Sequence, residues 1–103
     1  MEKYSQIIIL SNTYTNNNQN ILIINEPVLL IDENHLSVNN INYTFDYLIF
    51  TNHNQITNFD KSSIMHENGI PVTNCLYQTT FENIYYPYNG NVEEAINNIF
   101  ENN

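Results

Sequence analysis

Two uninterrupted apolar runs predict strands that are buried on both faces. The segment 4–10 ends in four consecutive aliphatic residues at 7–10, and the segment 46–50 is apolar from Tyr47 onward. Short β-branched runs without alternating polar positions are typical of strands in a parallel sheet that is covered on both sides. We therefore predict one buried strand at 4–10 and a second at 46–50.

Between these runs the pattern changes to strict alternation, which predicts a β-meander over about residues 28–45. Leu36 and Val38 alternate with a serine, and the segment 41–45 alternates apolar with polar side chains. Asn39 and Asn40 separate the two segments, and asparagine tolerates the positive φ of a two-residue hairpin turn. Further strands are predicted at 21–24, 28–32 and 83–86, and a polar turn at 51–54. A short helical turn is predicted within 58–65, and tight turns at Asn68-Gly69 and Asn89-Gly90.

The last predicted element is an amphipathic helix over 92–101. Asn91 precedes it as a candidate N-cap, and Glu93 and Glu94 lie in its first turn, where the helix dipole favours anions. Its apolar stripe has helical spacing and is expected to face the core: Val92, Ala95, Ile96, Ile99 and Phe100. The predicted fold is a single α/β or α+β domain over 1–103, with a small sheet, the meander, the buried strand 46–50 and this helix. Residues 11–20 are predicted to form a flexible polar loop.

Charge limits the partners of this chain more than any motif does. Lys3 and Lys61 are its only basic residues, against eleven aspartates and glutamates, so the formal net charge is −9. Such a surface repels nucleic-acid phosphates and anionic lipid and attracts basic protein surfaces. We expect a protein partner with a basic surface, no direct nucleic-acid binding and no membrane association. Asparagine is abundant, with 22 of 103 residues, and lysine is scarce, so AT-rich codon usage alone does not explain the composition.

The residue types that carry catalysis or hold cofactors are sparse. Cys75 is the sole cysteine, which leaves neither a disulfide framework nor a CxxC pair. Two glycines are too few for a GxGxxG motif, and Gly69 and Gly90 are too far apart to be the two glycines of a P-loop. The histidines are not spaced for a helical metal site, and each is expected to be solvated in a turn: His35, His53 and His66. We predict no enzyme activity, no metal and no catalytic residues. Without a signal-peptide pattern or an apolar run of about 20 residues, a cytoplasmic protein is expected.

Tyrosines near the predicted helix are the best candidates for protein contact. Tyr85, Tyr86 and Tyr88 lie within four residues, just before Glu93 and Glu94. Tyrosine is enriched at interface hot spots, so these five residues form the predicted contact set. A packed strand end explains the tyrosines equally well.

From residue 39 onward, the order of features resembles the C-terminal part of the FAD domain in thioredoxin-reductase-like pyridine nucleotide oxidoreductases. That family runs from a meander into an aspartate and an apolar strand, similar to 46–50 here, followed by a turn similar to 51–55. The segments 66–73, 78–85 and 92–96 resemble its next blocks. The resemblance implies a flavin contact at Asn52, Tyr88 and Asn89. However, Asn52 replaces the turn glycine and Tyr88-Asn89 replaces the Gly-Asp that meets the flavin.

These departures imply a degenerate domain, and no cofactor is expected, with FAD as the exception if the resemblance is functional. The leading expectation is a small acidic, non-catalytic protein-binding module that acts as an inhibitor or adaptor on a basic surface. One alternative is a phage- or plasmid-type inhibitor that mimics nucleic acid. The other is a degenerate flavin- or nucleotide-binding fragment. A homodimer also remains open, since exposed Ile-rich strand edges favour pairing between copies.

Overall fold

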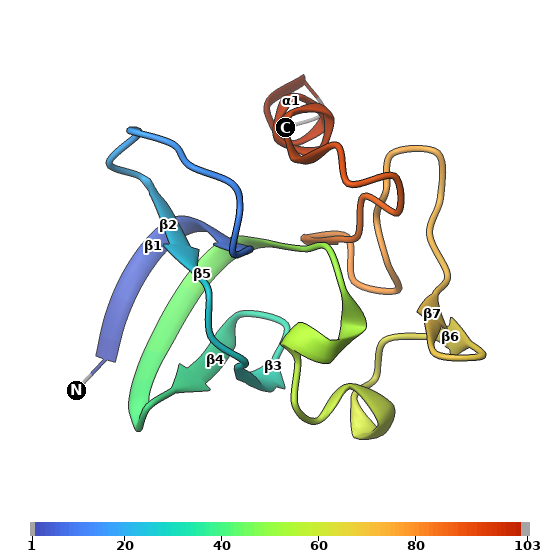
Figure 1. The fold of residues 1–103 in the computed structure, drawn as a ribbon, viewed down its shortest axis with the longest axis horizontal. Helices are drawn as coiled ribbons and strands as arrows, with labels where there is room; N and C mark the ends of the chain where they lie inside the picture. Colours follow the sequence, from blue (N-terminus) through green and yellow to red (C-terminus); the bar gives the residue numbers. More distant parts are fainter. Residues whose placement is uncertain (1, 102–103) are drawn as a thin grey trace.

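The computed structural model describes residues 2–101. They form a mixed β-sheet with an α-helix on one face, and the hairpin of residues 29–38, which is part of the sheet, curls over the other face (Figure 1). The strands of the sheet are β1 (Glu2–Leu10), β2 (Ile21–Ile24), β3 (Leu29–Asp32), β4 (His35–Val38), β5 (Ile41–Phe50) and β8 (Ile84–Tyr85). Two 3₁₀ turns, η1 (His53–Gln55) and η2 (Phe59–Lys61), and a small hairpin of β6 (His66–Glu67) and β7 (Ile70–Pro71) lie between β5 and β8. The helix α1 (Val92–Glu101) follows. The predicted α+β class is confirmed.

The strand β5 organises the sheet because it changes partner along its length. The strand order is β2-β1-β5-β4-β3, and β1 runs parallel to both β2 and β5. On the other side of β5, the first half pairs antiparallel with β4 and the second half pairs parallel with β8. The last segment of the predicted meander, 41–45, and the predicted buried strand 46–50 are therefore one continuous strand, and residue 46 lies near the point where the partner changes.

Two hydrophobic cores cover the two faces of the parallel part of the sheet. We call the first the hairpin-side core; β3, β4 and the segment 56–64 help to close it, and its members include Ile8, Leu36, Phe45, Leu48 and Phe50. We call the second the helix-side core; α1 closes it, and its members include Ile7, Ile9, Ile49, Tyr85 and Ile99. Neighbouring residues of β1 thus enter opposite cores. This explains why the run at 7–10 has no polar positions.

The asparagine turns have the backbone geometry that the sequence predicts. Asn39 and Asn40 have φ of 51° and 64°, as a two-residue hairpin turn between β4 and β5 requires. Asn68 and Gly69 have φ of 53° and 79° at the β6–β7 turn, and Gly90 has φ of 78° before α1. The 3₁₀ turn at Phe59–Lys61 lies within the predicted helical turn, and η1 lies at the end of the predicted polar turn.

The predicted helix is confirmed over Val92–Glu101, with one correction to its apolar stripe. The Asn91 side-chain oxygen accepts a hydrogen bond from the Glu94 backbone N–H at 3.1 Å, which makes Asn91 the cap. The buried helix residues are Val92, Ala95, Ile96 and Ile99. Phe100 was predicted to join them but is 52 % exposed. On a helix with about 3.6 residues per turn, Phe100 is rotated by about 100° from Ile99 and lies at the margin of the buried face.

The loop 11–20 connects two parallel strands without the helix that usually makes such a crossover. Its asparagines bind their own backbone: the Asn16 and Asn18 side chains accept hydrogen bonds from the backbone N–H groups two residues on, at 2.7 and 2.8 Å. Such local bonds compete with helix formation, so the polar composition explains the irregular connection. Within residues 2–101, no helix is long and apolar enough to cross a membrane.

Candidate protein-binding surface

The acidic side chains of this fold are exposed and almost entirely without cationic partners. All eleven carboxylates are exposed, as are Lys3 and Lys61. Among residues 2–101, the one ion pair joins His35 Nδ1 and Asp32 at 2.7 Å, and neither lysine forms one. The pKa of Asp32 is lowered, first by the hydrogen bond from the Asn34 backbone N–H and also by His35. Among residues 2–101, the negative charge of the surface is therefore not balanced by lysine side chains.

Tyrosine hydroxyls hold several of these carboxylates in place of lysine or arginine. Tyr4 donates to Asp46 at 2.6 Å and Tyr77 donates to Glu94 at 2.8 Å. Tyr14 donates a short hydrogen bond to Glu93. A neutral donor orients a carboxylate without cancelling its charge, whereas an ammonium or guanidinium group would orient the carboxylate and also cancel its charge.

Two of these pairs meet at the start of α1 and form what we call the tyrosine–glutamate cluster: Tyr14, Tyr77, Tyr88, Glu93 and Glu94. The Tyr88 ring is 66 % exposed and packs edge-on against Tyr77, with ring centroids 5.3 Å apart. Tyr14 comes from the loop 11–20, so its bond to Glu93 also ties that loop to the helix. The cluster joins exposed aromatic area to two ordered carboxylates.

The Tyr77 backbone is specifically shaped for this arrangement. Its φ is 70°, a left-handed conformation that is uncommon for a large non-glycine residue. The Tyr77 N–H donates to the Asn74 carbonyl oxygen at 3.1 Å, and the Tyr77 carbonyl accepts from the Tyr86 N–H at 2.8 Å. These bonds hold the unusual conformation, with the ring buried and the hydroxyl at Glu94. Such strain is found most often at functional sites.

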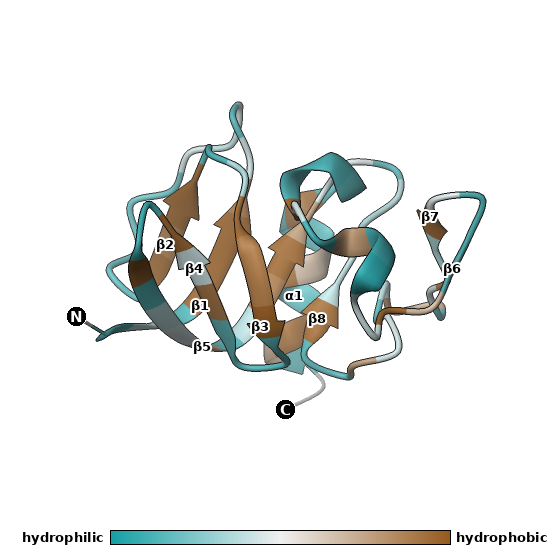
Figure 2. Ribbon diagram, turned by 90° about the horizontal axis from the view of Figure 1, so that it is seen from below, coloured by the Kyte–Doolittle hydropathy of each residue, from teal (hydrophilic) through white to brown (hydrophobic). Residues whose placement is uncertain are grey.

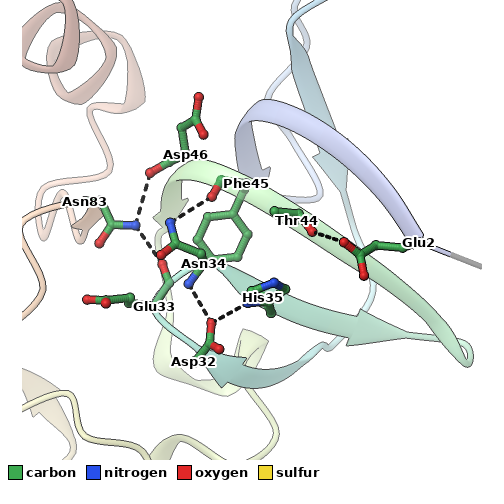
Figure 3. A network of polar contacts seen from close by, with 9 residues as sticks. All are labelled: Glu2, Asp32, Glu33, Asn34, His35, Thr44, Phe45, Asp46 and Asn83. Carbon is green, nitrogen blue, oxygen red and sulfur yellow. Dashed lines mark hydrogen bonds and ion pairs between the residues drawn. The ribbon is translucent and has the colours of Figure 1, made fainter.

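A second acidic region lies at the opposite end of the sheet, where Asn83 holds three segments together. Figure 3 shows the Asn83 amide between the backbone carbonyl oxygens of Glu33 and Asp46, with bonds of 2.6 and 3.0 Å. The Asp46 and Glu33 carboxylates point away from the network (Figure 3). On the neighbouring strand, Glu2 accepts a hydrogen bond from Thr44 at 2.8 Å. This region also has an exposed tyrosine, because Tyr4 is 62 % exposed and holds Asp46, but it has one such tyrosine–carboxylate bond among the described residues where the cluster has two.

The structure separates the three tyrosines of the predicted contact set. Tyr88 is exposed, as are Glu93 and Glu94. Tyr85 was predicted to contact a partner but is 0 % exposed, because it pairs with Ile49 in the sheet and points into the helix-side core. Tyr86 is half-buried, with its ring 5.1 Å from that of Phe50. The sequence pattern does not indicate that Tyr14 and Tyr77 lie beside the glutamates. They are 79 and 17 residues from their glutamate partners, and no sequence spacing signals such pairs.

The flavin positions implied by the family resemblance lie at the carboxyl ends of the parallel strands. Two open hollows of about 350 and 370 Å³ share Thr51 there, at the edge where open α/β sheets bind ligands. Asn52 lines one hollow, and its side chain caps η1. Asn89 binds Tyr77 and the Asn91 N–H. Among the described residues, those lining the hollows include Glu26 and Glu93 and no cation, so a pyrophosphate does not fit.

Two of the three histidines differ from the solvated turn residues that the sequence predicts, whereas His35 lies in β4 with its side chain 40 % exposed. His53 and His66 are half-buried, and their rings lie 5.6 and 4.7 Å from the ring of Phe59. They serve as packing around η2. Within residues 2–101, no group of three or more histidine, cysteine or acidic side chains is placed to hold a metal ion, and Cys75 is exposed.

We expect Tyr77 to titrate above the ordinary tyrosine pKa of 10.0. The hydrogen bond to Glu94 is the main cause of its raised pKa; for Tyr14 it is burial, followed by the bond to Glu93. Because the folded state favours the neutral phenol, this contribution to stability is complete below pH 10 and is lost as the pH rises through the folded pKa. Ultraviolet titration should show that Glu94→Gln lowers the pKa of Tyr77.

Glu101→Gln is the control for that titration, because it makes the same charge change at the other end of α1. An equal shift of the Tyr77 pKa in both variants would mean that net charge, rather than the Tyr77–Glu94 bond, sets the value.

No protein-family model, no curated protein and no solved structure matches this chain.

Proposed function

We propose that this chain is a small, non-catalytic protein-binding module that acts as an inhibitor or adaptor by docking on a basic protein surface. The observation that supports it is the set of eleven exposed carboxylates with a single ion pair, to a histidine, among residues 2–101. A basic partner supplies the cations that the chain lacks, and complementary charge speeds the encounter and selects the partner.

The tyrosine–glutamate cluster is the proposed docking site. Tyr88 offers a largely exposed ring, and rigid tyrosines contribute contact area at low entropic cost. Glu93 and Glu94 are held by Tyr14 and Tyr77, so little side-chain freedom is lost when a partner binds. The acidic region around Asn83 has one such pair, Tyr4 with Asp46, where the cluster has two, and we assign it to long-range attraction.

The test is affinity capture from the native host with two double variants as bait. Glu93→Gln/Glu94→Gln removes both charges of the cluster and keeps the side-chain shapes. Asp60→Asn/Glu67→Gln makes the same charge change on exposed residues of η2 and β6, outside the cluster. We expect the first variant to weaken binding of the captured protein by about tenfold or more, since each lost 1.4 kcal/mol is tenfold, and the control by much less.

Salt and nucleic acid then separate this function from its alternative. Binding to a basic surface should weaken as salt is added, because exposed charges are screened beyond about 8–10 Å. A partner that releases DNA or RNA when this chain binds would favour the nucleic-acid-mimicking inhibitor. If wild-type bait enriches no protein, or if both double variants bind alike, docking through the cluster is wrong.

A further inference from the structure

The edges of the sheet at β3 and at β2 differ in whether another part of the chain covers them. The outer edge of β3 is covered by the segment 55–58. The Val28 N–H donates to the Gln55 carbonyl at 2.9 Å, and the Thr57 N–H donates to the Val28 carbonyl at 2.8 Å. One step along, the Asn58 side chain binds both the N–H and the carbonyl oxygen of Leu30, at 3.0 and 2.8 Å. This edge has no free backbone groups over 28–30 to pair with another strand.

The edge at β2 has no such cover. Among the described residues, β2 pairs with β1 alone. The carbonyl oxygens of Asn20 and Ile24 accept hydrogen bonds from β1 and from Ser11 just after it, both at 3.0 Å. Since strand residues alternate in direction, Leu22 also faces β1, and the N–H and C=O of Ile23 point outward.

The side chains of β2 are all aliphatic, so the open edge is also hydrophobic. Figure 2 shows β2 at one side of the sheet and hydrophobic along its length. Ile21 and Ile23 are half-buried against the helix-side core, and Leu22 is half-buried against the hairpin-side core. Proteins usually protect an edge strand with lysine, proline, a bulge or a covering segment. The strand β2 has no lysine, proline or bulge, and among the described residues no segment covers its outer edge.

Charge indicates which partner suits this edge. None of residues 4–25 is charged, although the chain carries a net charge of −9. A second copy meets like charge over most of the molecule, and this uncharged stretch is where two copies approach with least repulsion. A basic partner is instead drawn to the carboxylates, which all lie outside residues 4–25.

We infer that β2 pairs antiparallel with β2 of a second copy, about a two-fold axis beside Ile23. Each Ile23 N–H then donates to the Ile23 carbonyl oxygen of the other copy, and the sheet continues across both chains. This register leaves the Ile21 N–H on the Asn18 carbonyl, where it already donates at 3.1 Å. A four-residue edge buries little area, so the dimer should dissociate on dilution.

Sedimentation equilibrium of the full chain over a wide concentration range tests this pairing, together with hydrogen exchange of the Ile23 amide. We expect a concentration-dependent dimer of the 12.1 kDa chain in which Ile23 becomes protected as the dimer forms. Added salt should strengthen the dimer, because it screens repulsion between two acidic copies. Binding to a basic partner responds to salt in the opposite direction.

Two lysine variants complete the design. Ile23→Lys places two cations beside the two-fold axis, and the long side chain keeps its apolar stem on the core. It should weaken the dimer by about tenfold or more. Ile31→Lys makes the same charge change on β3, where Ile31 is 53 % exposed, and should leave the dimer intact.

Three results would overturn the inference. They are a monomer at every concentration, a dimer in which the Ile23 amide exchanges as fast as in the monomer, and equal dimerisation of both lysine variants. Circular dichroism checks the fold of each variant, and exchange in the unmodified chain decides the matter if Ile23→Lys does not fold.

Discussion

Tyr85→Ala is expected to lower the free energy of unfolding by about 3–5 kcal/mol, as for other large aromatic residues removed from a core. The Tyr85 ring is fully buried in the helix-side core, and its strand β8 completes the sheet beside Ile49. A domain of this size is stable by roughly 5–15 kcal/mol, so this loss should remove between about a fifth and all of that stability. Urea denaturation followed by circular dichroism measures the effect.

Tyr88→Ala is the matched control, because the same chemical change is made three residues away on an exposed ring. We expect its stability to remain within about 0.5 kcal/mol of the wild type, while binding of a basic partner weakens. Tyr85→Phe keeps the buried ring and should cost only about 1 kcal/mol. Equal destabilisation by Tyr85→Ala and Tyr88→Ala would contradict the burial that distinguishes the two tyrosines.

Asn58→Ala should lower the free energy of unfolding by about 2–3 kcal/mol, a large effect for a side chain that is only half-buried. The Asn58 amide binds the Leu30 N–H and carbonyl oxygen as a neighbouring strand would. Its loss leaves two backbone groups of an edge strand unpaired and exposes that edge to other molecules. Denaturation and light scattering should show lower stability together with new self-association.

Asn54→Ala is the control on the same segment, since Asn54 is exposed and follows the cap of η1. Its stability should change by about 0.5 kcal/mol or less. If Asn58→Ala behaves like Asn54→Ala, the two bonds to Leu30 do not hold the edge in solution.

Local patterns in the sequence predict the elements that depend on neighbouring residues. The Asn39-Asn40 turn, the cap at Asn91 and the helix over 92–101 follow from turn chemistry, capping and helical spacing. The apolar runs at 7–10 and 47–50 predict strands covered on both faces, and two cores cover them. These predictions succeed because each depends on a few residues that are close in the chain.

The surface was harder to predict because its contacts join distant residues. Tyr85 and Tyr88 look alike in the sequence, and only the pairing of β8 with β5 shows that one is buried and the other exposed. Tyr4 meets Asp46 across 42 residues, and Tyr14 meets Glu93 across 79. Such pairs follow from the register of β1 on β5 and from the path of the loop 11–20.

The composition of the helix-side core has a consequence for synthesis on the ribosome. Its members range from Ile7, near the start of the chain, to Ile99 in the last helix. A growing chain emerges from its N-terminus, so Ile7 and Ile9 leave the exit tunnel long before β8 and α1 can cover them. The sheet therefore completes only after residues 84–101 have left the exit tunnel, and until then the early aliphatic strands have exposed hydrophobic surface that favours aggregation.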